Sequence, residues 1–350
     1  MADVTTFDSR LRVERVVRDG LQWRSVHEAP FAVYGLIWED DRFRRIPKAV
    51  SSAVSEGVDY LNDNTAGGRV RFATDSDTIA VDVTLVAVGK MPHFALTGSV
   101  GFDVYTDEGD GYRYAGTLIP PFDVTEHFEA KVHLGTRRRR EVMLHFPLYS
   151  GIKELLIGVN EDATLEAGAS YADARPIAFY GSSITQGGCA SRPGNSYQAI
   201  ASREMNFDFV NLGFSGCGCG EPLMAEHIAS LPLRAFVLDY DHNAPTPEHL
   251  QATHFAFYET VRRAHPTIPI VMMTRPTFRL NGEELARLAI VRETCEKARA
   301  AGDTAVYVID GRELVGEELA EVSTVDGAHP NDAGFYAMAK RLMRTLTECL

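Results

Sequence analysis

The first half of the chain alternates between polar and apolar residues over short stretches. Residues 69–74 and 78–88 show this alternation, and residues 100–105, 141–146 and 154–159 continue the series. Clusters of Gly, Pro and Asp separate several of these stretches, as turns separate the strands of a sheet. A period of two predicts strands with one buried face. The first half is therefore expected to form a β-sandwich or jelly roll.

The second half, after Pro176, has a different pattern. Short apolar runs occur in it, separated by segments with helical periodicity. Strands buried on both faces have this continuous apolar character, which is typical of a parallel sheet covered by helices. The predicted strands are residues 177–180, 209–212, 235–238, 268–273 and 305–309, and the predicted helices are residues 197–205, 247–265, 282–300 and 331–347.

A polar stretch rich in Ala and Gly, residues 160–175, lies between the two patterns and is the expected linker. The predicted organisation is a β-sandwich domain over residues 1–165, followed by an α/β domain over residues 166–350. A length of 350 residues agrees with two domains, at roughly 150 residues per domain.

Composition and charge exclude several classes of protein. The chain is 45% hydrophobic and 24% charged, which rules out wholesale disorder, and its net charge is -13. Binding to nucleic acid or to an anionic membrane needs clustered cations, so neither partner is expected. The run of arginines at residues 137–140 is expected to be a solvated turn or strand edge rather than a binding patch.

The N-terminus and the cysteines indicate a cytoplasmic protein. No apolar stretch follows a basic start, which argues against a signal peptide, and no apolar run approaches the ~20 residues of a membrane helix. The five cysteines include no Cys-x-x-Cys pair and fit reduced thiols. The Cys217-Gly218-Cys219 spacing is weak support for a zinc site.

Polar residues and glycines follow the predicted strands of the second half, where catalytic groups lie in such sheets. Ser183 stands in a small-residue turn, and it can be an exposed nucleophile or an ordinary turn serine. Gly216 lies after the second strand and allows either a close ligand approach or a plain tight turn. Asn243, after the third strand, can donate to an oxyanion or cap the next helix.

The last such position is the sequence Asp-Gly-Ala-His-Pro at residues 326–330, just before the final helix. A carboxylate beside a histidine orients the imidazole and stabilises its charged form, so Asp326 and His329 are a candidate acid and base pair. Asp239 and His242 have the same spacing, so spacing alone does not choose between the two histidines.

Taken together and in this order, these elements resemble the SGNH (GDSL-type) hydrolase superfamily over residues 176–350. Residues 181–187 match the family's Gly-Asp-Ser-Ile-Thr block, which makes Ser183, not Ser182, the implied nucleophile. The family's flavodoxin-like α/β/α fold with three layers is implied with it. A β-sandwich ahead of this domain resembles the subgroup that contains carbohydrate acetyl esterases and some acyltransferases.

The resemblance also implies a role for each matching residue. His329 is the implied base and Asp326 orients it. The N–H groups of Ser183 and Gly216, with the side chain of Asn243, are the implied oxyanion hole. Two blocks depart from the pattern, because Ser182 replaces the usual Asp and residues 240–243 replace Gly-x-Asn-Asp.

The expected function is hydrolysis of short-chain acyl esters, in particular acetyl esters of carbohydrate, through an acyl-serine intermediate. No metal or organic cofactor is implied. Two alternatives stay open, an acyltransferase that acylates an alcohol of a small molecule and a non-catalytic glycan-binding protein. The expected partner is a small-molecule or oligosaccharide acyl ester, and a homo-oligomer is left open.

Two further residues are weaker candidates for substrate binding. His242 is a second candidate base, but a place in the pocket wall or a structural role is expected for it. Arg275 follows the fourth strand and can contact an acidic or sugar substrate, although a structural ion pair is the expected interpretation.

Overall fold

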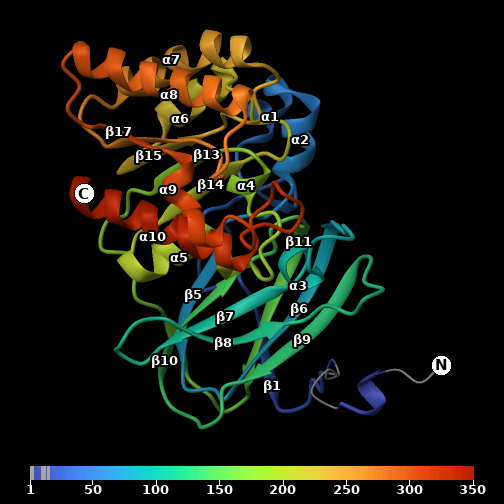
Figure 1. Cartoon of the computed structure of the whole chain (residues 1–350). Helices are drawn as coiled ribbons and strands as arrows, with labels where there is room; N and C mark the ends of the chain where they lie inside the picture. Colours follow the sequence, from blue (N-terminus) through green and yellow to red (C-terminus); the bar gives the residue numbers. More distant parts are fainter. Residues whose placement is uncertain (1–3, 9–12, 14–15) are drawn as a thin grey trace.

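The structure, a computed structural model, describes residues 4–8, 13 and 16–350 (Figure 1). The first half of the chain forms mainly a β-sandwich, and the second half forms an α/β part. In Figure 1 the β-sandwich lies below, and the α/β part, which carries the C-terminus, lies above it. Each part has an apolar core of its own.

Two antiparallel sheets face each other in the sandwich, with apolar side chains between them. The first sheet has, in order, β1 (Leu21–Ser25), β11 (Gly151–Asn160), β6 (Thr78–Ala87) and β9 (His127–His133). The second has β12 (Leu165–Ala167), β5 (Arg69–Thr74), β10 (Arg140–His145), β7 (Phe102–Asp107) and β8 (Arg113–Leu118), and β2 (Ala32–Tyr34) also pairs with β5. A separate hairpin consists of β3 (Ile37–Glu39) and β4 (Arg42–Arg44).

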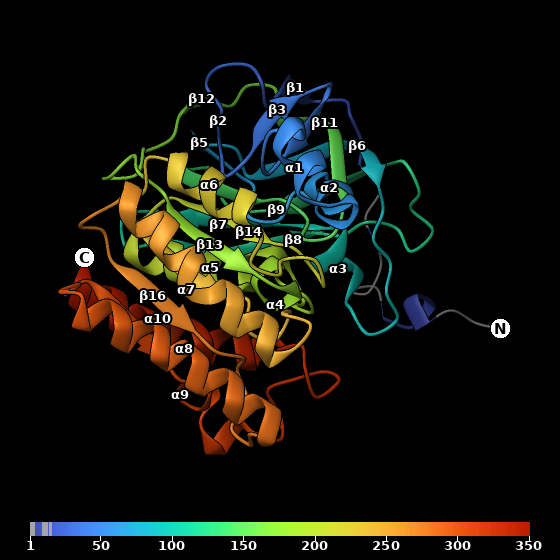
Figure 2. The ribbon, with the colours of Figure 1, turned by 90° about the horizontal axis from the view of Figure 1, so that it is seen from above.

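The α/β part is a parallel sheet between two layers of helices (Figure 1), and Figure 2 shows it from above, with one helix layer in front of the sheet. Its strand order is β14 (Phe209–Gly213), β13 (Ile177–Gly181), β15 (Ala235–Asp239), β16 (Ile270–Met273) and β17 (Val306–Ile309). Numbered along the chain this is 2-1-3-4-5, the flavodoxin-like order, in which ligands bind outside the carboxyl ends of the strands. The α/β/α prediction is confirmed.

Apolar helix faces cover both sides of this sheet. One side carries α6 (Pro222–Ser230), α7 (Pro247–Ala264) and α8 (Gly282–Ala300). The other side carries α5 (Tyr197–Met205), α9 (Gly311–Val315) and α10 (Asp332–Cys349). The predicted helices correspond to α5, α7, α8 and α10, whereas α6 and α9 had no clear signal. Within the described residues, no helix combines the length and the apolar character that crossing a membrane requires.

Two short helices of the first half pack against the second half. These are α1 (Lys48–Val54) and α2 (Glu56–Asn62), and α1 contacts α6. Val58 and Leu61 of α2 belong to the same apolar core as Phe214 and Met224. The α/β part therefore borrows apolar surface from a segment that precedes it by more than a hundred residues.

Arg69 joins the sandwich to the parallel sheet. In β5, Val70 and Phe72 point into the sandwich core, so by strand alternation Arg69 points to the opposite face. That face is covered by the α/β part, and Arg69 is wholly buried. Its guanidinium donates to the carboxylate of Asp208 and to the carbonyl of Phe209, and lies 3.9 Å from the centre of the Phe209 ring.

Other contacts extend the same interface. The Arg45 guanidinium donates to the Gly213 carbonyl at the end of β14. Asp103 of β7 accepts hydrogen bonds from the Gly194 N–H at 3.0 Å and lies 3.3 Å from Arg192. Burial raises the pKa of Asp103 to about 6. These buried polar contacts fix one orientation of the sandwich on the α/β part.

The arginine run at residues 137–140 has paired charges. Arg137, Arg138 and Arg139 are at least one-third exposed and form ion pairs with acidic side chains of the sandwich. Arg140 differs from the expectation, because it is buried at the start of β10 and donates to backbone carbonyls as well as to Glu108. The run therefore consists of the end of the loop between β9 and β10 and the first residue of β10.

Replacement of Arg69 tests how strongly the interface stabilises the protein. We expect Arg69→Met to lower the free energy of unfolding by about 3–5 kcal/mol, because Asp208 would stay largely buried without its partner. In the control Arg139→Met, the side chain is 54% exposed and the loss should be below about 1 kcal/mol. Urea unfolding of both variants measures the difference, and equal losses would contradict this role of Arg69.

Candidate active site

Ser183 stands directly after the carboxyl end of β13, where the chain turns into the short helix α4 (Ser183–Gln186). The hydroxyl of Ser182 caps this turn by accepting a hydrogen bond from the Ile184 N–H at 3.1 Å. Ser182 thus performs the capping role that an Asp side chain can also perform. The Ser183 side chain is mostly buried, with 8% exposure.

The three residues predicted as nucleophile, base and orienting acid lie together. The Ser183 hydroxyl oxygen is 2.9 Å from His329 Nε2, and His329 Nδ1 is 2.7 Å from a carboxylate oxygen of Asp326. Ser183 comes from the strand-to-helix turn, whereas the other two come from the loop before α10. The fold thus brings together two residues that are 146 positions apart in the chain.

Asp326 is held as an anion. Its partial burial alone would raise its pKa, but hydrogen bonds from the backbone N–H and ring of His329 and from the Ala328 N–H outweigh that effect. The net result is a pKa of Asp326 well below the usual range. The carboxylate therefore stays charged at neutral pH and can stabilise an imidazolium.

Arg275 supports the loop that carries Asp326. Its guanidinium lies 2.7 Å from the Glu284 carboxylate and donates to the Gly327 carbonyl at 2.8 Å. Both contacts are within the protein, so the geometry is the structural ion pair that was the expected interpretation. A contact between Arg275 and substrate stays a prediction.

The two other oxyanion-hole candidates lie in neighbouring loops. Gly216 has φ +69°, in the left-handed region that favours glycine, and a Cβ there would meet no atom within 4 Å. Asn243 donates one amide N–H to the Phe214 carbonyl at 3.2 Å. An amide has two N–H donors, so the second can point elsewhere. Asn243 is therefore tied to the loop of Gly216.

His242 lies beside Asp241, with 3.1 Å between His242 Nδ1 and the carboxylate. Its Nε2 is buried and has no hydrogen-bond partner among the described residues. The pair Asp241–His242 thus differs from Asp326–His329, in which Nε2 faces a serine. The structure joins His329, and not His242, to Ser183.

Asp239, which sequence spacing indicated only as a candidate partner of His242, lies beneath the serine turn. One of its carboxylate oxygens accepts hydrogen bonds from the hydroxyls of Thr185 and Tyr197, at 3.0 and 3.1 Å. Burial and the nearby charge of Asp241 raise the pKa of Asp239 well above its usual range. A neutral, buried carboxyl group is therefore favoured here.

The sandwich reaches the same turn, which sequence patterns could not indicate. The Tyr149 hydroxyl donates to the Ser183 carbonyl at 3.3 Å, and the Gln186 amide donates to the Leu148 carbonyl at 3.2 Å. His93, in the loop after β6, lies with its Nε2 4.0 Å from Asp326. Both parts of the chain thus build the site.

Cys189 lies close behind α4 and is nearly buried. Burial, with the charge of Asp326, raises the pKa of its thiol to about 11. A neutral thiol is a poor nucleophile. Cys189 therefore does not compete with Ser183.

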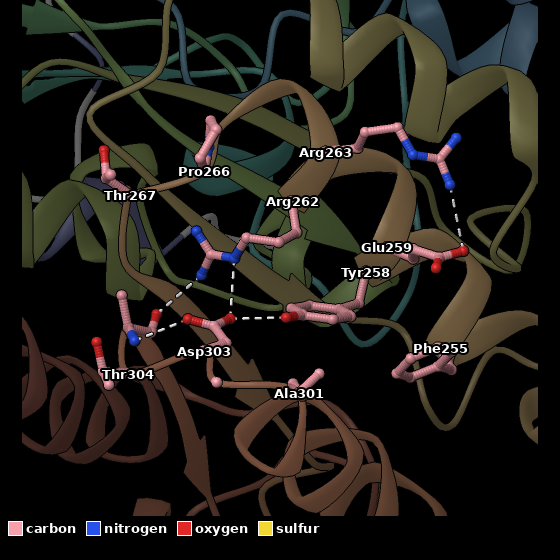
Figure 3. A pocket seen from close by; sticks show the side chains of 13 residues that line it. Phe255, Tyr258, Glu259, Arg262, Arg263, Pro266, Thr267, Ala301, Asp303 and Thr304 are labelled. Atoms are coloured by element: carbon pink, nitrogen blue, oxygen red, sulfur yellow. Dashed lines mark hydrogen bonds and ion pairs between the residues drawn. The ribbon is translucent and has the colours of Figure 1, made fainter.

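A cavity of about 570 Å³ lies away from these residues, between the ends of α7 and α8 (Figure 3). Thr267 and Ala305 line it and precede β16 and β17, so it lies at the amino ends of strands whose carboxyl ends face the site. Its main polar groups already pair with each other, because Asp303 contacts both Arg262 and Tyr258. This cavity adds no chemistry to the site.

Two family models match the chain. Residues 174–347 match the GDSL-like lipase/acylhydrolase family, and residues 21–165 match the N-terminus of SGNH-hydrolase-type esterases. No curated protein matches the chain.

Solved structures resemble both parts together. A candidate GDSL-like lipase from Bacteroides ovatus is 29% identical, with a TM-score of 0.84 over 94% of this chain and 98% of that one. A salicylyl-acyltransferase from a tetracycline biosynthetic pathway is 23% identical, with a TM-score of 0.76 over the same shares. An acetyl xylan esterase from Butyrivibrio proteoclasticus is 14% identical, with a TM-score of 0.60 and again the same coverage. The last two likenesses concern the fold.

The raised pKa of Asp239 predicts a pH dependence of stability. In the folded state Asp239 keeps its proton at pH values where the same side chain in the unfolded state has lost it. The free energy of unfolding therefore falls as pH rises from about 4, the pKa in the unfolded state, towards the pKa in the folded state. The decrease is at most about 1.4 kcal/mol per pH unit. Asp239→Asn should remove this contribution, leaving a smaller loss of stability between pH 5 and pH 8. Urea unfolding at both pH values measures it, with Asp162→Asn on the surface as control. Equal losses in the wild type and Asp239→Asn would contradict the prediction.

Proposed function

The chain belongs to the SGNH (GDSL-type) hydrolase superfamily and is a carboxylic-ester hydrolase. We propose that it is a serine esterase that removes short acyl groups, in particular acetyl groups, from carbohydrate. The observation that supports this most directly is the chain of contacts from Ser183 through His329 to Asp326. The likeness to an acetyl xylan esterase supports the choice of acyl group and substrate.

The proposed reaction has two steps. As Ser183 Oγ attacks the ester carbonyl, His329 Nε2 takes the serine proton, and Asp326 stabilises the imidazolium. The tetrahedral intermediate collapses when the alcohol leaves with the proton from His329. Water then attacks the acyl-serine as His329 Nε2 takes its proton. The bond from the acyl carbon to Ser183 Oγ breaks, the proton returns from His329 to Oγ, and the acid leaves.

The oxyanion needs hydrogen-bond donors in a fixed position. The backbone N–H groups of Ser183 and Gly216 are proposed to supply two of them. Asn243 is proposed to supply the third through the amide hydrogen that does not bind Phe214. Loss of one such donor typically lowers the rate about 10²–10³-fold.

The nucleophile is tested by release of p-nitrophenol from its acetate, butyrate and octanoate esters. We expect acetate to be preferred, and Ser183→Ala and His329→Ala to lower kcat by on the order of 10³-fold or more. Ser182→Ala is the matched control, since it removes the neighbouring hydroxyl and only a helix cap. A wild type no faster than Ser183→Ala on every ester would favour a non-catalytic glycan-binding protein.

Acyl transfer is the second candidate function. The sandwich contacts the serine turn through Tyr149 and Leu148, so both parts of the chain adjoin the proposed nucleophile. The likeness to a salicylyl-acyltransferase over both parts also supports it.

The two functions differ in what attacks the acyl-serine. If the chain is a hydrolase, added small-molecule alcohols should leave free acid as the main product. The measurement is the ratio of acylated alcohol to free acid, with Ser183→Ala as the blank. Acylated alcohol that forms faster than free acid would replace the hydrolase proposal by the transferase.

A further inference from the structure

Three side chains with metal-ligating atoms surround one flank of the proposed active site. They are His93 from the sandwich, Cys189 from the loop after α4, and His329. One ligand atom of each lies within 4.8 Å of the others. The ring centroids of the two histidines are 6.0 Å apart. Two parts of the fold thus place two imidazoles and a thiol around one point.

Space is available beside this cluster. A cavity of about 380 Å³ is lined by His93 and Cys189, together with Ser191, Asn331 and Asp332. The Cys189 side chain is nearly buried, whereas His93 is exposed and His329 is partly exposed. An ion can therefore approach from solvent along His93 and reach the thiol without opening the apolar core.

The nitrogen and sulfur atoms of these side chains determine which metal ions the cluster prefers. Two imidazoles and one thiolate suit zinc and similar borderline-soft ions, whereas magnesium and calcium prefer oxygen ligands. We infer that His93, Cys189 and His329 form a zinc site that switches off the esterase. On binding, Cys189 releases its thiol proton to solvent and its sulfur coordinates the ion, with no change of oxidation state.

The inhibition follows from the contacts of His329. Its Nε2 faces Ser183 at 2.9 Å and its Nδ1 faces Asp326 at 2.7 Å, so both nitrogens are in use. Whichever nitrogen takes the ion gives up one of these contacts. If it is Nε2, Asp326 remains on Nδ1 as the carboxylate partner that metal-bound histidines usually have. In either case His329 can no longer act as a base for Ser183.

The first test measures the rate of ester hydrolysis at increasing zinc concentrations. The rate of each variant is compared with the rate of the same variant without metal. We expect zinc to inhibit the wild type, and His93→Ala and Cys189→Ser to need about tenfold more zinc or more. His127→Ala and Cys349→Ser are the matched controls, a second exposed sandwich histidine and a second free cysteine. Magnesium should not inhibit. Equal zinc sensitivity in all variants would overturn the inference.

The inhibitory effect rests on the proposed function, but the site itself is tested without it. Ser183→Ala keeps all three ligands and lacks the nucleophile. Cobalt(II) added to this variant should give the near-ultraviolet absorption of a cobalt–thiolate bond, and the double variant with Cys189→Ser should not. Absence of the band in Ser183→Ala would overturn the site. If the band appears in Ser183→Ala but the wild type hydrolyses no ester, the proposed function alone is overturned.

Discussion

The buried contact of Arg69 with Asp208 and Phe209 is the interaction on which the rest of the arrangement depends. It fixes the outer face of the sandwich against β14, the edge strand of the parallel sheet. From β14 the Asn211 side chain donates to the carbonyl of Thr185, in the helix that begins with Ser183. The position of the sandwich and the position of the serine are therefore linked by a short series of buried hydrogen bonds, which are costly to break.

The secondary-structure elements could be predicted from the sequence, because the periodicity of apolar residues along the chain determines them. The apolar runs gave the parallel strands, and their ends gave the positions of Ser183, Gly216 and Asn243, because the carboxyl ends of parallel strands meet at one edge. The pairing of His329 with Ser183 could be inferred only from the family resemblance or from the structure, since Asp239 and His242 have the same spacing as Asp326 and His329. The spacing of Asp239 to His242 does not indicate its place beneath the serine turn, because that place depends on the hydroxyls of Thr185 and Tyr197.

The contribution of the first half to the site lay beyond sequence reasoning for a physical reason. Tyr149 and His93 lie in the sandwich half, and only the docking of two parts brings them to the serine turn and to Asp326. The periodicity of apolar residues along the chain does not indicate such contacts, because they join segments that are far apart in the sequence. The sandwich is therefore one wall of the candidate site, beside the loops of the parallel sheet.

The placement of α1 and α2 has a consequence for synthesis on the ribosome. Their apolar side chains Val58 and Leu61 are covered by partners such as Met224, which leave the ribosome more than 150 residues later. At about 5–20 residues per second, that delay is roughly ten to thirty seconds. During that time only neighbours in the first half, such as Ile46, can cover these side chains, and the apolar surface that α6 later contacts stays exposed on the nascent chain.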